Sequence, residues 1–196
     1  MPSFTRPSAD QPPRERLLNA ATALFCQRGI NAVGVDAIVE QAGTAKTTLY
    51  KLFGSKEQLV EEVLTREGEI WRDWFTTATA KAGGSSRDRL LAIFPVLAQW
   101  FRQKQFYGCP FINAVAEHDK SSDRLRELAL KHKRQVLDYI RALSADAGVA
   151  DPERLTHEIA LLMDGAIVAA MITKDPGVAG VAQNALTRML DAELRT

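Results

Sequence analysis

The residues with the clearest chemistry lie on one short helix, predicted over residues 45–53. Hydroxyl and ammonium groups recur on one side of it at offsets of three, four and seven, with no acid among them: Thr44, Thr47, Thr48 and Lys51. Threonine hydroxyls donate or accept hydrogen bonds, their methyls can contact thymine methyls, and a lysine can reach guanine acceptors. This face is suited to the major groove of DNA, and we expect Thr47, Thr48 and Lys51 to read the bases.

Three neighbouring residues suit contact with phosphates. Lys46 and Tyr50 flank the polar face, and Lys56 lies at the start of the next helix, where free backbone N–H groups also attract anions. The opposite side of the 45–53 helix is apolar, and we expect its residues to be buried against the two preceding helices: Ala45, Leu49, Leu52 and Phe53.

The elements that position these side chains are two short helices joined by a tight turn. Apolar residues recur at helical spacing over 35–42, and Ala42-Gly43-Thr44 separates that stretch from the 45–53 helix. This is the spacing of a helix-turn-helix, whose second helix enters the major groove. The alternative is a solvated helical hairpin with incidental polar residues.

Helical patterns cover most of the remaining chain. A helix is predicted over 13–28, and Ser55 with Gln58 forms a capping-box pattern before a longer helix. After the Gly83–Ser86 linker come a helix that Pro95 should kink, a short apolar segment over 110–116, and three further helices: 125–148, 152–173 and one that follows Pro176-Gly177. Because no segment alternates with a period of two, we expect an all-α protein of about nine helices.

Composition and charge narrow the classes of function. The 196 residues carry 25 Lys+Arg and 24 Asp+Glu, so the net charge of +1 indicates neither a nucleic acid nor a membrane as a partner. Residues 1–56 nevertheless hold seven basic and four acidic side chains. The longest apolar stretch, 159–172, contains Asp164 and is too short to span a bilayer, and two cysteines make no disulfide framework. The expected location is the cytoplasm, with no membrane partner.

The sequence of residues 35–59 resembles that of a known family. Its Ala-Gly turn, the Thr-Leu-Tyr-x-x-Phe core and the following Ser-Lys-Glu-x-Leu resemble the DNA-binding domain of TetR-type (TetR/AcrR-like) transcriptional regulators. The resemblance implies a homodimeric repressor of a pseudo-palindromic operator, released when a small ligand binds. Val33-Gly34, Ala45, Thr47 and Leu52 depart from the usual pattern, so the family's base preference is not transferable.

Three regions follow from the pattern and the resemblance. Residues 1–12 are expected to be a flexible arm, 13–58 an N-terminal three-helix helix-turn-helix DNA-binding domain, and 59–196 a C-terminal helical domain for ligand binding and dimerisation. Arg6, Arg14 and Arg16 could add minor-groove or phosphate contacts, although plain disorder is favoured for the arm. The last two helices are expected to form the dimer interface, because small residues such as Gly165 allow close approach.

The C-terminal region is rich in large apolar side chains that could line a ligand pocket between helices. His132 is a candidate as well, although a core histidine is favoured, and Asp164 is expected to pair within the protein. The candidate pocket residues are Trp71, Phe75, Phe94, Trp100, Phe101, Phe111, Ile112, His132 and Met163. The pattern predicts an unknown, largely apolar effector, with double-stranded operator DNA as the other partner.

The sequence leaves two alternatives to a ligand-released repressor. One is a DNA-binding regulator with no small-molecule effector, controlled by a protein partner or by its own abundance. The other is an enzyme, which we do not expect because the sequence shows no glycine-rich phosphate loop, metal-ligand cluster or nucleophile context. Cofactors and metals are likewise not expected, and Cys109 is interpreted as a small buried residue rather than a redox sensor.

Overall fold

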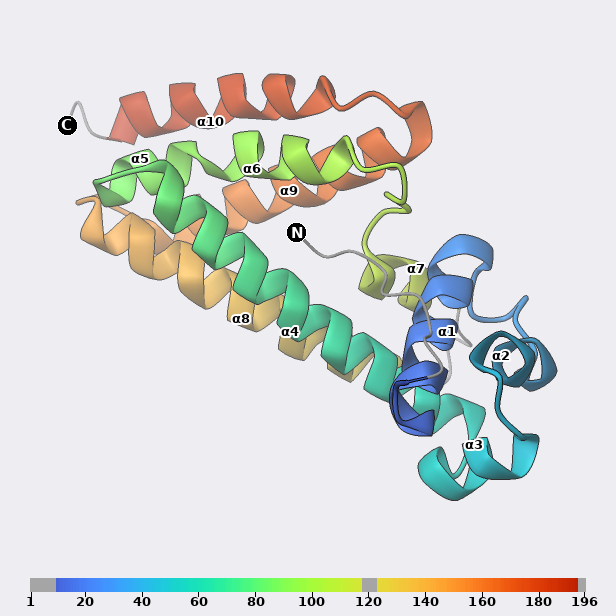
Figure 1. Cartoon of the computed structure of the whole chain (residues 1–196). Coiled ribbons are helices and arrows are strands. Elements are labelled where there is room, and N and C mark those ends of the chain that lie inside the picture. Colours follow the sequence, from blue (N-terminus) through green and yellow to red (C-terminus); the bar gives the residue numbers. More distant parts are fainter. Residues whose placement is uncertain (1–9, 118–122, 194–196) are drawn as a thin grey trace. The chain divides into compact units, whose positions relative to one another are not determined.

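The structure is a computed structural model that describes residues 10–117 and 123–193, and every regular element in those ranges is an α-helix (Figure 1). The all-α fold class is confirmed. The predicted arm over 1–12 lies outside the described residues except for its last three positions. The helices are α1 (Pro13–Arg28), α2 (Val35–Ala42), α3 (Lys46–Phe53), α4 (Lys56–Ala82), α5 (Ser86–Leu91), α6 (Ile93–Phe101), α7 (Pro110–Glu117), α8 (Arg124–Asp146), α9 (Pro152–Thr173) and α10 (Val178–Glu193).

The described chain forms two compact units. One unit comprises residues 10–70 and 110–130 without 118–122, and we call it the DNA-reading unit after the role expected of α1 to α3. The other comprises residues 71–109 and 131–193, and we call it the regulatory unit after the role expected from the sequence. Helices α4 and α8 each contribute to both units, and α7 belongs to the DNA-reading unit. The sequence-based division at residue 58 therefore does not coincide with the division between these units, because α4 runs without interruption through both positions.

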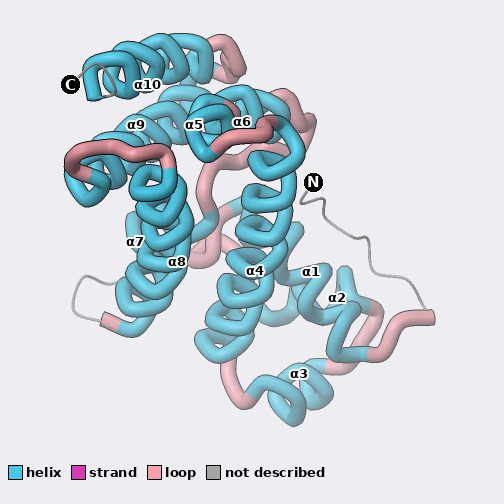
Figure 2. The backbone as a smooth tube through the Cα atoms, turned by 90° about the vertical axis from the view of Figure 1, so that its left-hand side faces the viewer, coloured by secondary structure: helices cyan, strands magenta, loops and turns pink. Residues whose placement is uncertain are grey.

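Helices α1, α2 and α3 form a three-helix group (Figure 2). The predicted apolar stripe of α1 is buried, including Leu17 and Leu24. It packs with α2 and α3, whose buried residues include Ile38 and Leu49. The side chain of Ser55 caps α4 as expected, since its Oγ accepts a hydrogen bond from the Gln58 N–H at 3.2 Å.

The turn between α2 and α3 is closed by backbone hydrogen bonds. Gly43 has a φ of 60°, in the left-handed region that favours glycine. Its N–H donates to the Glu40 carbonyl at 3.1 Å, and the Thr44 N–H donates to the Val39 carbonyl at 2.9 Å. This pairing satisfies the last carbonyls of α2 and sets the angle at which α3 leaves the turn.

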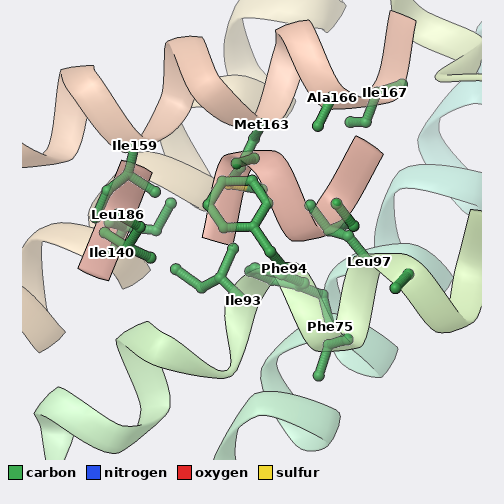
Figure 3. Close-up of a cluster of buried hydrophobic side chains, with 14 of the residues drawn as sticks. Phe75, Ile93, Phe94, Leu97, Ile140, Ile159, Met163, Ala166, Ile167 and Leu186 are labelled. Carbon is green, nitrogen blue, oxygen red and sulfur yellow. The ribbon is translucent and has the colours of Figure 1, made fainter. Parts of the chain in front are cut away.

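The regulatory unit has an apolar core drawn from α4, α6, α8, α9 and α10. Phe75, Phe94, Ile140, Ile159 and Leu186 are at most 1% exposed and come from five different helices (Figure 3). Residues this deeply buried and interdigitated form the packed interior of the unit.

Pro95 has a larger effect than a kink. The helix expected around it is divided at Ala92 into α5 and α6, which is why the described residues hold ten helices where about nine were predicted. Proline has no N–H and its ring clashes with the carbonyl four residues earlier, here that of Leu91. Pro95 is consequently accommodated in the first turn of α6, where the N–H is not needed.

Helix α9 is long and apolar enough to cross a membrane by length and composition alone. One side of it is buried in the core through Leu155, Ile159, Met163 and Ile167. The expectation that this stretch is too short to span a bilayer is therefore wrong as regards length, because the helix that contains it has 22 residues. The buried side accounts for part of the apolar composition of α9.

Candidate nucleic-acid interface and regulatory site

Helix α3 buries a narrower face than its sequence suggested. Leu49 and Phe53, four residues apart, are 0% and 4% exposed. Ala45 is exposed and Leu52 is 39% exposed, so the expectation that both would be buried is wrong. Successive residues of a helix are about 100° apart around its axis, and the deeply buried side of α3 is the line that carries Leu49 and Phe53.

The outward face of α3 is formed by Thr47, Tyr50 and Lys51, all of which are exposed. They occupy positions i, i+3 and i+4, so their side chains share one side of the helix. Thr48 is half-buried. The hydroxyl of Thr44 is buried and finds no hydrogen-bond partner among the described residues, although the residue as a whole is half-buried. The polar surface therefore centres on Thr47, Tyr50 and Lys51.

Two of the three predicted lysines make contacts within the DNA-reading unit. Lys46 Nζ lies 2.9 Å from Asp36 Oδ1, and the hydrogen bond and charge of Asp36 raise the pKa of Lys46. Lys56 Nζ donates a hydrogen bond to the Ile30 carbonyl at 2.7 Å. Lys51 is exposed on the outward face of α3. The predicted contact lysines thus differ in how readily each ammonium can meet a phosphate.

Two arginines of α1 contact the turn and the second helix of the helix-turn-helix. Arg16 donates to the Gly43 carbonyl at 3.1 Å, in the turn between α2 and α3. The guanidinium of Arg14 lies 5.5 Å from the centre of the Phe53 ring and forms an ion pair with Glu62 of α4. These contacts give Arg14 and Arg16 a role in holding α3 in place, which the sequence pattern did not reveal.

A network of polar side chains joins α1 to the first half of α4. Arg66 donates to Thr22 Oγ1 at 3.0 Å and to Glu15 at 3.4 Å. Glu67 accepts from Thr22 at 3.5 Å, and burial raises the pKa of Glu67 against the opposing effects of Arg66 and Thr22. The network fixes α1 to α4, so the three-helix group and the start of α4 are tied together.

The regulatory unit contains an aromatic cluster, defined here as Trp71, Trp74, Phe75, Trp100 and Phe106. The ring of Trp71 stacks on Phe75 with centroids 4.8 Å apart, and it meets Trp100 edge-on at 5.7 Å. Trp100 in turn meets Phe106 edge-on at 5.0 Å. Such ring pairs add about 0.5–1.5 kcal/mol each beyond their buried area.

One polar atom of this cluster is left unsatisfied. The indole Nε1–H of Trp71 is buried and has no hydrogen-bond acceptor among the described residues, while Trp71 is only 9% exposed. A buried donor without an acceptor costs about 1–3 kcal/mol and calls for an explanation such as a bound molecule.

His132 borders the same ring. Its centroid is 5.8 Å from that of Trp71, and Arg72 Nη1 lies 2.9 Å from His132 Nδ1. Burial, reinforced by the charges of Arg72 and Lys133, lowers the pKa of His132 to about 4. The imidazole is therefore neutral at pH 7, with Nδ1 as the acceptor for the guanidinium. Asp164 pairs with Lys133, as expected of a carboxylate that pairs within the protein.

The predicted pocket residues are divided between the units. Seven belong to the regulatory unit, whereas Phe111 and Ile112 belong to the DNA-reading unit. Phe94 and Met163 fill the core at 0% and 4% exposure. A separate hollow of about 330 Å³, partly open to solvent, lies within the DNA-reading unit, and none of its lining residues was predicted: Phe25, Cys26, Ile30, Val60, Val63, Leu64, Pro110, Asn113 and Glu117. Its members come from α1, α4, α7 and the 29–31 turn, which no single stretch of sequence brings together.

Metal chemistry finds no support in the parts of the chain that are described. Among residues 10–117 and 123–193 there is no group of three or more His, Cys, Asp or Glu side chains that could hold a metal ion. The chemistry of the molecule lies instead in the polar face of α3 and in the aromatic cluster.

A helix-turn-helix carried by an all-helical chain defines the class of DNA-binding transcriptional regulators. Two family models match: "Bacterial regulatory proteins, tetR family" over residues 17–63, and "Tetracyclin repressor-like, C-terminal domain" over residues 86–186, just over half of the chain. The chain belongs to the TetR family of transcriptional regulators. Proteins of this family are regulators and not enzymes.

Relatives span nearly the whole chain. The HTH-type transcriptional regulator Rv0196 of Mycobacterium tuberculosis is 27% identical over 94% of this chain and 97% of its own length. The structure of SCO4454, a TetR-family regulator from Streptomyces coelicolor, matches with a TM-score of 0.85 and 28% identity, covering 92% of this chain and 95% of that one. CifR, solved with a 26-bp double-strand operator, shares the fold at a TM-score of 0.78 and 23% identity, covering 93% and 98%.

Proposed function

We propose that this protein is a homodimeric repressor that binds a pseudo-palindromic operator and is released by a small, largely apolar ligand with a hydrogen-bond acceptor. The observation that carries the DNA-binding part is the exposed face of α3, where Thr47, Tyr50 and Lys51 lie together. A helix presenting hydroxyls and an ammonium can contact base edges and phosphates at once. The fold shared with CifR, which was solved on operator DNA, supports this reading.

The dimer part rests on an apolar surface of the regulatory unit. Leu161 and Ile172 of α9 are 73% and 71% exposed, and Val181 of α10 is 73% exposed. Leu161 and Ile172 are eleven residues apart, three turns of helix, so they share one side of α9. Large aliphatic side chains this exposed mark an interaction surface. Because TetR regulators act as dimers, the occupant we propose is the same surface of a second copy.

The ligand part rests on Trp71. Its buried indole N–H lacks an acceptor among the described residues, and flat aromatic rings surround it. Arg72 places a positive charge near His132, while the neutral imidazole adds none. A flat apolar molecule with a carbonyl or carboxylate oxygen would satisfy the indole and stack on its neighbours.

The DNA-binding proposal is tested by selecting duplexes from a random pool with the purified protein. We expect a two-fold symmetric consensus, with half-sites about 34–36 Å apart. Lys51→Gln should weaken binding and reduce the slope of log K against log salt by about 1. If no duplex is enriched at low salt, the protein is not a DNA-binding regulator of this kind.

Three matched probes test the ligand proposal: 2-naphthoate, 2-naphthylamine and naphthalene, with binding followed by calorimetry. We expect 2-naphthoate to bind most tightly and to lower operator affinity. Trp71→Phe keeps a ring and removes the donor, so it should weaken 2-naphthoate and leave naphthalene unchanged. Trp100→Phe is the matched control, since it removes an indole that is not among the buried unsatisfied donors.

A second candidate function is a regulator without a small-molecule effector, controlled by a protein partner or by abundance. The deep burial of Phe75, Phe94 and Leu97, each at most 1% exposed, favours it because a filled core leaves little room. Failure of every apolar probe to bind, with intact operator binding, would support this alternative over ligand release.

A further inference from the structure

The turn over residues 29–31, between α1 and α2, is held by a helix far away in the sequence. The Asn31 N–H donates to Glu117 Oε2 at 3.3 Å, and Asn31 Nδ2 donates to the Glu117 carbonyl at 2.7 Å. Glu117 is the last residue of α7. Asn31 is thus bonded through both its backbone and its side chain to the end of a helix 86 residues further along the chain.

Gly29 allows this close approach. Its φ of 86° lies in the left-handed region, and a Cβ at this position would lie only 2.8 Å from Glu117 Oε2. A Cβ at residue 29 would therefore displace the Glu117 carboxylate that accepts the Asn31 N–H. The turn and the end of α7 are shaped to fit each other.

The other side of the same turn is bonded to the start of α4. The Ile30 carbonyl accepts a hydrogen bond from Lys56 Nζ at 2.7 Å. Lys56 is the first residue of α4 and follows Phe53, the last residue of α3, by three positions. The 29–31 turn therefore joins α7 on one side to the junction of α3 and α4 on the other.

A hollow that is partly open to solvent lies beside this turn. Ile30 and Glu117 both line it, together with Cys26 of α1 and Val60 of α4. The hydrogen bonds between Glu117 and Asn31 therefore lie at its edge.

We propose that Glu117 is a positioning residue for DNA binding: by holding the 29–31 turn it fixes, through Ile30 and Lys56, the junction from which the recognition helix α3 leaves. The inference rests on the proposed function and deepens it by naming a residue that positions the recognition helix.

Hydrogen exchange of the wild-type protein tests the proposal without any substitution. The Asn31 amide is followed by mass spectrometry, with and without a duplex that the protein has selected from a random pool. If the contact belongs to the DNA-bound form, exchange at Asn31 and over 113–117 slows on binding. Faster exchange at Asn31 on binding the duplex would overturn the proposal.

Substitutions give an independent test by operator affinity. Glu117→Ala should weaken binding about tenfold, the size of a typical coupling between sites. Glu69→Ala on exposed Glu69 of α4 removes the same charge and should leave affinity unchanged or slightly higher. Glu117→Gln keeps an acceptor oxygen and should recover most of the loss. Adding Asn31→Ala to Glu117→Ala should weaken binding further, because it also removes the hydrogen bond from Asn31 Nδ2 to the Glu117 backbone carbonyl, which Glu117→Ala leaves in place.

The thiol of Cys26 reports on the same hollow. Iodoacetamide should alkylate Cys26 several times faster in Glu117→Ala than in Glu69→Ala, with the two melting temperatures alike. Wild-type protein that binds its duplex, with Glu117→Ala binding equally well, would refute the positioning role alone. Wild-type protein that selects no duplex at all would instead refute the proposed function, and this inference with it.

Discussion

Lys46 Nζ lies 2.9 Å from Asp36 Oδ1, so the first residue of the recognition helix is paired with the second residue of the helix before it. Both side chains are more than half exposed, at 52% and 81%. A pair this exposed contributes little to stability. We expect the pair to affect DNA binding instead, because the Asp36 carboxylate competes with a DNA phosphate for the Lys46 ammonium.

Releasing Lys46 should strengthen DNA binding. We expect Asp36→Asn to raise operator affinity and to make the slope of log K against log salt steeper by about 0.9, the value for one further phosphate contact. Fluorescence anisotropy at several KCl concentrations measures both. Glu40→Gln removes an exposed acid from the same helix without freeing Lys46, so an equal change in slope there would show that net charge alone is responsible.

The two leucines of α3 should respond differently to truncation. Leu49 is 0% exposed and Leu52 is 39% exposed. Leu49→Ala leaves a cavity and should cost about 2–5 kcal/mol, whereas Leu52→Ala should stay within about 0.5 kcal/mol. Urea denaturation of the two variants provides the comparison. Equal losses would mean that Leu52 is covered in the folded protein in solution.

Charge on the exposed side of α9 should separate the subunits. Leu161→Asp places an unpaired carboxylate in the proposed dimer surface, and we expect a monomer by analytical ultracentrifugation together with a loss of operator binding. Leu130 of α8 is 45% exposed and belongs to the other unit, so Leu130→Asp is the matched control and should remain dimeric. A dimeric Leu161→Asp variant would place the interface elsewhere.

His132 should make the protein sensitive to acid. Burial, with the charges of Arg72 and Lys133, lowers the pKa of His132 to about 4, against 6.5 for a free histidine. Between these values the unfolded chain binds a proton that the folded chain does not, so the free energy of unfolding falls as pH falls from 6.5 to 4. The loss reaches at most about 3 kcal/mol, since each pKa unit corresponds to about 1.4 kcal/mol.

His132→Asn should remove that part of the pH dependence. The difference in unfolding free energy between wild type and variant should shift steadily in favour of the variant from pH 6.5 to pH 4, as measured by urea denaturation. Glu67, whose pKa burial raises, has the opposite sign and is present in both proteins, so it cancels in the difference. A constant difference across this range would mean that His132 titrates normally.

The local elements were accurate from the sequence because their signals are local. The stripe from Leu17 to Phe25 and the turn at Gly43 each depend on residues within a few positions. The division of the helix around Pro95 shows the limit, since the proline effect was expected and its size was not. Propensity indicates where a helix is strained, and packing decides whether it bends or breaks.

The class of the protein follows from its sequence, because a short periodic pattern and a turn suffice to specify a helix-turn-helix. The partners of individual side chains depend on the tertiary fold. Lys56 contacts Ile30 across 26 positions and Glu117 contacts Asn31 across 86. The indole N–H of Trp71 finds no acceptor among the neighbours that residues 10–117 and 123–193 provide. Such partners depend on how helices distant in the chain pack against each other, which hydrophobic periodicity does not encode.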